Sequence, residues 1–519
     1  MALFMAPFMA LSLRPPFSRG DLMKLPVSLN VVLATAGLSW LSLPVAAQPA
    51  PGANPAPPAA EQPAATFEIY GTVVPLFYLG RTTGATAAGT MGASQVAAFS
   101  GVNAPARFVL DPGTSNLGFR GGVDLMKNLA VVWQIESGVP VGGEPAANTI
   151  ASRNTELGLS GSWGTLFVGN WDTPYKWSSN QIVSPIRAGF VADFNGILHG
   201  PGFGVNPVTT QPGRANALSD AAFYRRVGNT IQYWTPVKNG LAARVSYGAN
   251  EGRTARAGAN PPLNPSIFSA FVAYDTGPLR VRYAYEAHKD YFGMTPLGGS
   301  PVSNTNKKSL DQAHEFIAQY TRAAPGGDTR IVGIFEYLTY TSEDTTVPAM
   351  GAIPAKEYSR PAFYGLIQQG FGKHHLWGGF GMGMDGSCKL TNGAACTTSG
   401  LGANMATLGY VYRFSRNTDF FATAFRITNS KSGQYTSPNL QGTAAPGADA
   451  EAFGVGFVHQ FSVKLGGPVK ATAPPAQPSL PEVKPGPPPP PAPPPADATP
   501  PPAAPTTPPN PAAPTPPNP

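Results

Sequence analysis

The stretch SNLGFRGGVDLMKNLAVVWQIESG, residues 115–138, holds two runs of alternating apolar and polar residues, separated by Lys127 and Asn128. Such alternation indicates β-strands with one apolar face, and the short break predicts a tight turn between two antiparallel strands. One face carries Leu117, Phe119, Val123, Leu129, Val131, Trp133 and Ile135. The other face carries Asn116, Arg120, Asp124, Gln134 and Glu136. What has to be decided is which of the two faces meets water.

The composition of the chain excludes two broad classes of protein. Its 519 residues include 59 Gly and 59 Pro, and only 12% are charged, which is too rich in glycine and too poor in charge for an ordinary soluble enzyme. After residue 50 there is no uninterrupted apolar run of the roughly 18 residues that a spanning helix needs. A helical membrane protein is therefore not expected either.

The two ends of the chain read as segments outside the folded body. Residues 1–47 are predicted to be a secretory signal peptide, because Lys24 precedes an apolar stretch that ends in small residues before Gln48. Residues 48–66 are a Pro/Ala linker, and residues 462–519 form a Pro-rich tail that cannot bury a core and is expected to be disordered.

The two cysteines fit an exported protein. Cys388 and Cys396 lie in the Gly/Asn-rich segment CKLTNGAAC, and an exported chain meets an oxidising compartment, so a disulfide between them is predicted.

The body, residues 67–461, predicts an all-β fold. Short turns alternate without exception with long polar connections, which is typical of a 16-stranded antiparallel transmembrane β-barrel of the outer membrane. In a barrel the apolar face points outward to lipid and the charged face inward to a wet lumen. The sixteen alternating runs are residues 67–80, 115–126, 128–139, 152–161, 164–172, 223–236, 240–249, 266–275, 278–288, 312–322, 329–340, 358–369, 373–383, 404–414, 419–428 and 451–461.

Several segments together resemble one family over nearly the whole body. The opening hairpin, with LGLSGSWGTLFVGNWDTPY, RRVGNTIQYWTP and LGYVYRFSRNTDFFATAF, is similar to the general diffusion porins of Gram-negative bacteria of the "GFRG" type. Phe461 stands where that family has its terminal aromatic residue. The resemblance implies a homotrimer in the outer membrane, with the third long loop, here about Thr173 to Ala222, folded into the lumen as a constriction.

The charged residues assigned to the lumen suggest an ion preference. Rings of arginine favour anions, so a passive channel for small hydrophilic solutes and ions with weak anion preference is predicted. The alternative is that wall acids such as Glu156, Glu286, Glu315 and Glu336 neutralise the arginines. The predicted pore-lining residues are Arg120, Asp124, Glu136, Asp193, Arg226, Arg244, Arg280, Arg282, Arg330, Arg413 and Arg426.

An enzyme on a barrel scaffold is the less favoured reading. No G-x-S-x-G or H-E-x-x-H motif occurs, and the neighbours His314 and Glu315 would face opposite sides of a strand. The segment GMGMDG, residues 381–386, has the letters of a dinucleotide fingerprint, but no helical pattern follows it. No catalytic residue, cofactor, metal site or nucleic-acid partner is expected.

The tail suggests another role. Both ends of the body lie on the short-turn side, which would place the tail in the periplasm. The alternative function is therefore an anchor whose Pro-rich tail tethers the outer membrane to the cell wall or to a periplasmic partner.

Overall fold

The structure is a computed structural model. It describes residues 65–86, 90–91, 94–95, 103–111, 113–139, 141, 150–180, 185–186, 194–202, 222–249, 264–290, 308–324, 327–342, 355–390, 392–393, 397–437, 440 and 445–466. The predicted signal peptide and nearly all of the predicted linker and tail lie outside the described residues.

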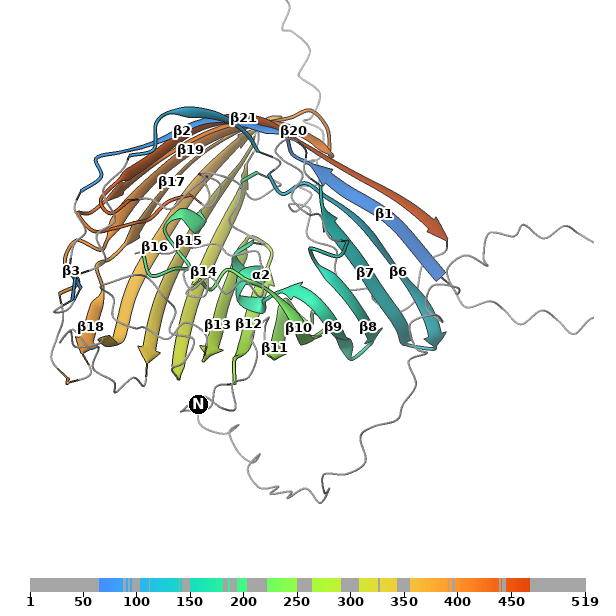
Figure 1. The fold of residues 1–519 in the computed structure, drawn as a ribbon. Coiled ribbons are helices and arrows are strands. Elements are labelled where there is room, and N and C mark those ends of the chain that lie inside the picture. Colours follow the sequence, from blue (N-terminus) through green and yellow to red (C-terminus); the bar gives the residue numbers. More distant parts are fainter. Residues whose placement is uncertain are drawn as a thin grey trace, which may run out of the picture. The chain divides into compact units, whose positions relative to one another are not determined.

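The described chain forms one large antiparallel sheet with little helix (Figure 1). Its strands are β1 (Ala65–Val73), β2 (Leu76–Thr83), β5 (Arg107–Asp111), β6 (Asn116–Met126), β7 (Leu129–Gly138), β8 (Thr155–Gly161), β9 (Gly164–Asp172), β10 (Arg226–Trp234), β11 (Leu241–Ala249), β12 (Ser266–Thr276), β13 (Leu279–Lys289), β14 (Ser309–Ala324), β15 (Gly327–Ser342), β16 (Ala355–Phe371), β17 (His374–Gly383), β18 (Ser387–Leu390), β19 (Ala403–Arg413), β20 (Thr418–Asn429) and β21 (Asp449–Gly466). The remaining elements are the two-stranded sheet of β3 (Thr90–Met91) and β4 (Ser94–Gln95), the helix α2 (Pro174–Asn180) and the 3-10 turn η1 (Phe194–Gly196).

The sheet closes on itself as a 16-stranded barrel, as the alternation of turns and long connections predicts. Three wall strands are interrupted, so β1 continues as β2, β5 as β6, and β17 as β18. The first and last strands meet where Thr66 pairs with Gly466 and Tyr70 with Ser462. Each of the sixteen predicted runs overlaps a wall strand.

The barrel is slightly longer at its seam than the predicted body. β1 begins at Ala65, and β21 continues for five residues after Phe461, to Gly466. The strand is longer because apolar and polar residues continue to alternate after Phe461. Val463 and Leu465 are the apolar members, and both are 56% exposed on the outer face.

Short turns on one side of the barrel have the chemistry that tight hairpins require. In the β10–β11 turn, Asn239 and Gly240 have φ angles of 53° and 80°. Lys238 and Leu241 exchange both backbone hydrogen bonds, each 2.9 Å long. Positive φ at both central residues is the requirement of a type I′ turn, which explains the Asn-Gly pair.

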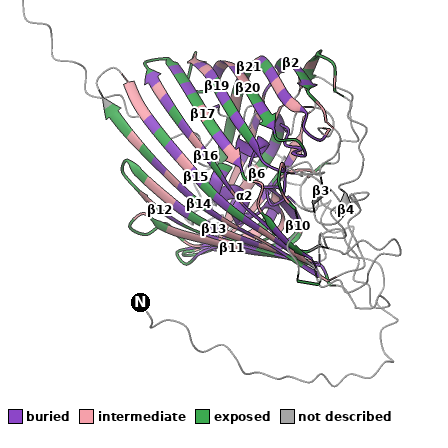
Figure 2. Cartoon of the chain, turned by 90° about the vertical axis from the view of Figure 1, so that its left-hand side faces the viewer, coloured by how far each residue is buried: buried purple, intermediate pink, exposed green. Residues whose placement is uncertain are grey.

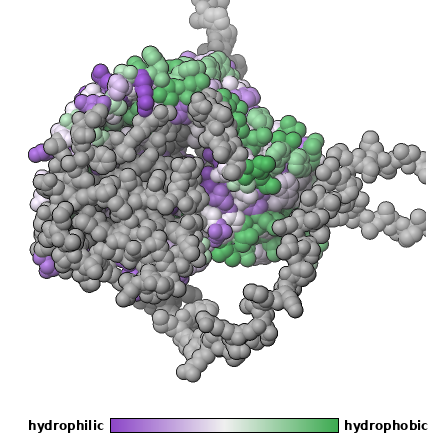
Figure 3. All heavy atoms as spheres, in the orientation of Figure 1, coloured by the Kyte–Doolittle hydropathy of each residue, from purple (hydrophilic) through white to green (hydrophobic). Residues whose placement is uncertain are grey.

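The opening hairpin shows which face is which (Figure 2). Leu117, Phe119 and Ile135 are 37–38% exposed, whereas Gln134 and Glu136 are buried. Exposed and buried residues alternate in this way along most of the wall, and large hydrophobic side chains cover its outer surface (Figure 3). The sheet is therefore inverted relative to a soluble protein, with the apolar face outward.

The inner face is not uniformly polar, which corrects the expectation of a charged and wet wall all round. On β2, β16, β19 and β20, inward side chains form an apolar cluster with residues of the connection between β9 and β10. The described residues of that connection lie inside the barrel and bury their own apolar side chains there. The cluster includes Leu76, Tyr78, Tyr364, Met405, Phe421, Phe425, Ile427, Phe194, Ile197 and Leu198.

The segment GMGMDG is part of the wall. It covers the end of β17 and the break before β18, where Asp385 accepts the N–H groups of Gly400 and Gly402 at 3.0 and 2.6 Å. Pro361 of β16 lies opposite this break, where a ladder hydrogen bond is not needed.

Among the residues that the structure describes, no helix is both long and apolar enough to cross a membrane.

Candidate functional site

The helix α2 is held against the inner wall by its polar side chains and backbone (Figure 1). The N–H of Tyr175 donates to Ser269 Oγ at 2.9 Å, and the Ser178 hydroxyl donates to Glu315 at 2.7 Å. Arg282 in turn donates to the Ser178 carbonyl at 3.1 Å. A helix this short gains little from its own hydrogen bonds, so these wall contacts fix its position.

Residues 194–202 are anchored to the same side of the wall. The N–H of His199 lies 2.9 and 3.0 Å from the two carboxylate oxygens of Glu336. Arg360, which is completely buried, donates from Nε to the Gly200 carbonyl at 2.7 Å and from Nη2 to the Ile197 carbonyl at 3.3 Å. We call α2 together with residues 194–202 the inward segment.

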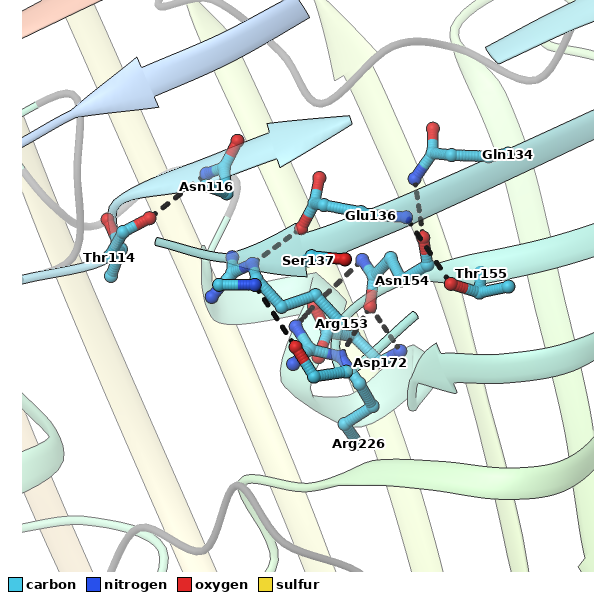
Figure 4. A network of polar contacts seen from close by, with 12 residues as sticks. Thr114, Asn116, Gln134, Glu136, Ser137, Arg153, Asn154, Thr155, Asp172 and Arg226 are labelled. Carbon is cyan, nitrogen blue, oxygen red and sulfur yellow. Dashed lines mark hydrogen bonds and ion pairs between the residues drawn. The ribbon is translucent and has the colours of Figure 1, made fainter. Parts of the chain in front are cut away.

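Polar residues on β7, β9 and β10 and in the connection before β8 form a network next to the inward segment (Figure 4). Arg153 Nε lies 2.6 Å from Glu136 Oε1, and Arg226 Nη2 lies 3.1 Å from Asp172 Oδ1. Asn154, which follows Arg153 in the chain, binds both members of the second pair: its Oδ1 accepts from Arg226 Nε at 2.6 Å and its Nδ2 donates to Asp172 at 3.1 Å. We call these five residues the wall network.

A third ion pair lies on the neighbouring strands β1 and β6. Arg120 of β6 makes a bidentate contact with Glu68 of β1, with distances of 2.9 and 2.8 Å. The guanidinium also lies 4.6 Å from the centre of the Tyr70 ring, and the Tyr70 hydroxyl donates to Glu136 at 3.0 Å. The pair and the wall network therefore form one continuous polar surface on the inner face.

In two of these pairs, Arg120–Glu68 and Arg153–Glu136, the side chain of the cation is more exposed than that of the anion. The side chain of Arg120 is 25% exposed and that of Glu68 is 12% exposed. For Arg153 and Glu136 the exposures are 21% and 2%. Water inside the barrel therefore meets more guanidinium than carboxylate surface at these two places.

Comparison with known proteins agrees with this architecture. The model of the Gram-negative porin family matches residues 34–432. The chain belongs to the Gram-negative porin family. No curated protein matches it.

Solved porin structures are similar to this chain at low sequence identity, and the first of the following shares its fold. The anion-selective porin from Comamonas acidovorans is 17% identical, with 76% of this chain and 100% of that chain covered and a TM-score of 0.54. OmpT of Vibrio cholerae is 15% identical, with coverage of 77% and 98% and a TM-score of 0.49. OmpF of Salmonella typhi, in a complex with daunomycin, is 15% identical, with coverage of 76% and 97% and a TM-score of 0.44.

The porin lies in the bacterial outer membrane and forms a channel for diffusion. The closed barrel can span the hydrocarbon region because it leaves no backbone group unpaired there. Its apolar outer face is the surface that meets lipid. The face that carries Arg120 and Glu136 is the one that can hold water. This assignment resolves the two faces of the opening hairpin.

The structure places nine of the predicted pore-lining residues of this porin on the inner face. Arg244 is among them, but its guanidinium stacks over Trp234 and Trp177, 3.6 and 4.5 Å from the ring centres. The nine are Arg120, Asp124, Glu136, Arg226, Arg244, Arg280, Arg282, Arg330 and Arg413.

The assignment of Arg426 to the lumen is wrong. In β20 the buried inward residues include Phe425 and Ile427, so Arg426 between them points outward. Its side chain is 61% exposed and pairs with Asp449 at 3.1 Å.

Three predicted features depend on residues that the structure does not describe. Asp193 of the constriction loop lies outside the described residues. Cys388 is buried in β18, but Cys396 also lies outside them, so the disulfide stays a prediction. The tail predicted to be disordered, residues 462–519, lies outside them beyond Gly466, whereas its first five residues belong to β21, which corrects the predicted boundary.

Sequence reasoning missed several charged residues of the inner wall. Arg360 shares its face with Ala362 and Tyr364, so the strand alternation could have found it. Arg153 and Lys176 lie outside the strands, where no alternation exists to assign them. Lys176 Nζ lies 2.8 Å from Asp172 Oδ1 and so adds a second cation to that carboxylate.

The inward segment contains two titratable groups whose charged forms are disfavoured. Burial lowers the pKa of Lys176 to about 8, although the neighbouring Asp172 opposes this effect. Burial also lowers the pKa of His199 to about 4, although Glu336 raises it. Both groups are thus held in a drier environment than the exposed arginines of the wall.

Proposed function

We propose that this porin passes small hydrophilic solutes and ions passively, with a weak preference for anions, and that it acts as a channel rather than as an enzyme. The observation that carries the anion preference is the unequal exposure of the two wall pairs, in which Arg120 and Arg153 face water more than Glu68 and Glu136 do. The similarity to the anion-selective porin from Comamonas acidovorans supports the same preference.

The preference should be weak because both exposed arginines are paired. An ion pair produces a smaller field than an isolated charge, but its field is directional when one partner is nearer the water. The low-dielectric wall of a narrow channel concentrates that field on passing ions. Anions should therefore accumulate slightly more than cations along this part of the wall.

Reversal potentials in a salt gradient across planar bilayers test the proposal. Replacing Arg153 by Gln removes the more exposed partner, so the anion preference should fall. Replacing Glu136 by Gln removes the buried partner of the same pair, so the anion preference should rise. Arg426→Gln is the matched control, because Arg426 is an arginine of the outer face.

Opposite shifts for the two wall variants, with no shift for the outer-face control, would support the proposal. A cation preference in the unmodified porin would reject it. Equal shifts for the wall arginine and the outer-face arginine would show that the effect is one of overall charge and not of the lumen.

The porin is proposed to act as a homotrimer. Membership of the porin family supports this assembly state. Native mass measurement in detergent tests it, and a mass of one chain would reject it.

A second candidate function is an anchor for the outer membrane. The last wall strand, β21, ends next to the first residues of β1, so the chain beyond Gly466 leaves from the side of the short turns. A tail on that side, the predicted periplasmic side, could reach the cell wall or a periplasmic partner. Loss of co-sedimentation with cell-wall material after truncation behind Gly466 would support this role, and unchanged co-sedimentation would remove it.

A further inference from the structure

His199, Glu315 and Glu336 meet at one point between the inward segment and the wall. His199 Nε2 lies 3.0 Å from Glu315 Oε2 and 3.7 Å from Glu336 Oε2. One donor atom from each of the three residues lies within 4.8 Å of the others, and all three side chains are completely buried. The two glutamates are direct cross-strand neighbours on β14 and β15.

We propose that these three residues bind a divalent cation of the zinc class. Zinc is bound at about 2.0–2.2 Å by imidazole nitrogen and carboxylate oxygen, which makes the edges of its ligand tetrahedron about 3.3 Å long. The two edges that start at His199 Nε2, 3.0 and 3.7 Å, bracket that length. One nitrogen and two oxygen donors do not suit calcium or magnesium, which take about six or more oxygen ligands.

Each of the three ligands is oriented by a further hydrogen bond. Nδ1 of His199 lies 2.9 Å from Asn195 Oδ1, an acceptor that can hold a proton on Nδ1, and with a metal ion bound this leaves the lone pair of Nε2 for the ion. The Ser178 hydroxyl donates to Glu315 Oε1 at 2.7 Å, and the Tyr175 hydroxyl donates to Glu336 Oε2 at 2.8 Å. Such outer partners fix the orientation of metal ligands and are part of a metal site.

The charged groups in contact within the cluster are the two carboxylates, the histidine and Arg360, whose Nη2 is 3.5 Å from Glu336 Oε1. Glu286, Lys176 and Arg282 also act on the cluster electrostatically. A bound cation would reduce the repulsion between the carboxylates of Glu315 and Glu336, which are direct cross-strand neighbours.

A cation at this point would join the inward segment to the wall. His199 belongs to the inward segment, whereas Glu315 and Glu336 belong to β14 and β15. The ion would therefore hold residues 194–202 at a fixed distance from the wall, and with them the width of the channel. This role is additional to diffusion and does not depend on ion preference.

Zinc content and thermal stability test the proposal. The full-length chain and its variants are refolded into detergent micelles with zinc chloride, and unbound metal is removed by gel filtration. The unmodified chain should retain about one zinc per chain, and His199→Gln and Glu315→Gln should retain none. His288→Gln is the matched control, because His288 is equally buried with Nε2 2.8 Å from Glu286 Oε1 and should leave zinc binding unchanged.

Three further measurements separate binding from folding. Zinc should raise the unfolding temperature of the unmodified chain and of His288→Gln, but not that of His199→Gln. Asn195→Ala, which removes only an outer partner, should weaken binding by about 10- to 100-fold. X-ray absorption at the zinc edge of the unmodified chain should show one nitrogen and two oxygen protein ligands, so the proposal can be tested even if a variant does not fold.

Three results would overturn the proposal. The first is that the unmodified chain retains no zinc after gel filtration. The second is that the unmodified chain and His199→Gln retain equal amounts of zinc, and the third is that the X-ray absorption spectrum shows no histidine ligand.

Discussion

Gly118 allows a tyrosine from one strand to cross over the next. Tyr70 of β1 lies directly opposite Gly118 of β6, and its hydroxyl continues to Glu136 of β7. A Cβ atom at Gly118 would lie 2.3 Å from Cζ of the Tyr70 ring. The glycine before Phe119 and Arg120 in the opening sequence is therefore needed for packing of the inner face, and not for a turn.

Replacing Gly118 by Ala should destabilise the barrel by about 1–3 kcal/mol, the usual cost of overpacking a close contact. The measurement is the free energy of unfolding by urea in detergent micelles, followed by tryptophan fluorescence. Gly333→Ala is the control, because no heavy atom lies within 4 Å of a Cβ built at Gly333. If the two substitutions change the free energy of unfolding equally, the position of the Tyr70 ring does not depend on the absence of a Cβ atom at Gly118.

Lys176 predicts a pH dependence of ion preference. Since burial lowers its pKa to about 8, it is charged below that pH and neutral above it. The wall then loses one positive charge, so the anion preference should decrease between about pH 7 and pH 9. In Lys176→Met the preference should be lower than in the unmodified chain at pH 7, about equal to it at pH 9, and unchanged between the two values. Reversal potentials at the two pH values measure this, and an equal pH response of the variant would reject the assignment.

The face on which a charged residue lies could be predicted from sequence only where one face of its strand is clearly apolar. In β19, Leu408 is exposed on the outer face, which correctly places Arg413 inward. In β20 the sequence TDFFATAFRITN has phenylalanines on both faces. Alternation cannot distinguish the two faces there, and Arg426 was assigned to the wrong one.

At the scale of elements, the inward segment depends on Arg360 of β16. This buried arginine donates to the carbonyls of Ile197 and Gly200 and lies 3.5 Å from Glu336. Replacing it by Met should cost about 3–5 kcal/mol of stability, because a carboxylate and two carbonyl groups lose a buried partner. Single-channel recordings should also become noisier as residues 194–202 move away from the wall.

Unfolding in urea and current noise at constant voltage measure the two effects of Arg360→Met. Arg426→Met is the comparison, because it removes an exposed arginine from an exposed pair and should cost at most about 1 kcal/mol. A quiet channel after Arg360→Met would show that other contacts suffice to hold the inward segment.

The strands could be predicted from sequence, but the inward segment could be expected only through the family resemblance. Strands of a barrel repeat one local pattern, so their number and order follow from periodicity and turn lengths. The position of α2 depends on single contacts, such as the hydrogen bond from Ser178 to Glu315, which have no period. The apolar inner cluster was missed for a related reason, since Leu76 and Phe77 are adjacent and both faces of β2 are apolar.

At the scale of the whole molecule, the barrel is closed by the last residues of β21. Ser462 to Gly466 pair with Tyr70 to Thr66, and the Ser462 hydroxyl donates to Glu68 at 2.6 Å. A chain truncated after Gly466 keeps all of these contacts, whereas one truncated after Phe461 loses them. The shorter chain should therefore be less stable.

Heat-dependent mobility on gels measures this difference. The chain that ends at Gly466 should unfold at the temperature of the full-length chain, and the chain that ends at Phe461 should unfold at a lower temperature. If both unfold at the same temperature, the five residues after Phe461 contribute nothing to closure.

The pairing of Thr66 with Gly466 also determines when the molecule can form. The two partners belong to the first and the last wall strand to be synthesised, so no nascent chain can complete the ring before β21 has been made. Bringing together such distant residues has a high cost in chain entropy, and folds of high contact order form slowly. Until then both edge strands have unpaired backbone groups that can join a neighbouring molecule, so delivery to the membrane has to keep nascent copies apart.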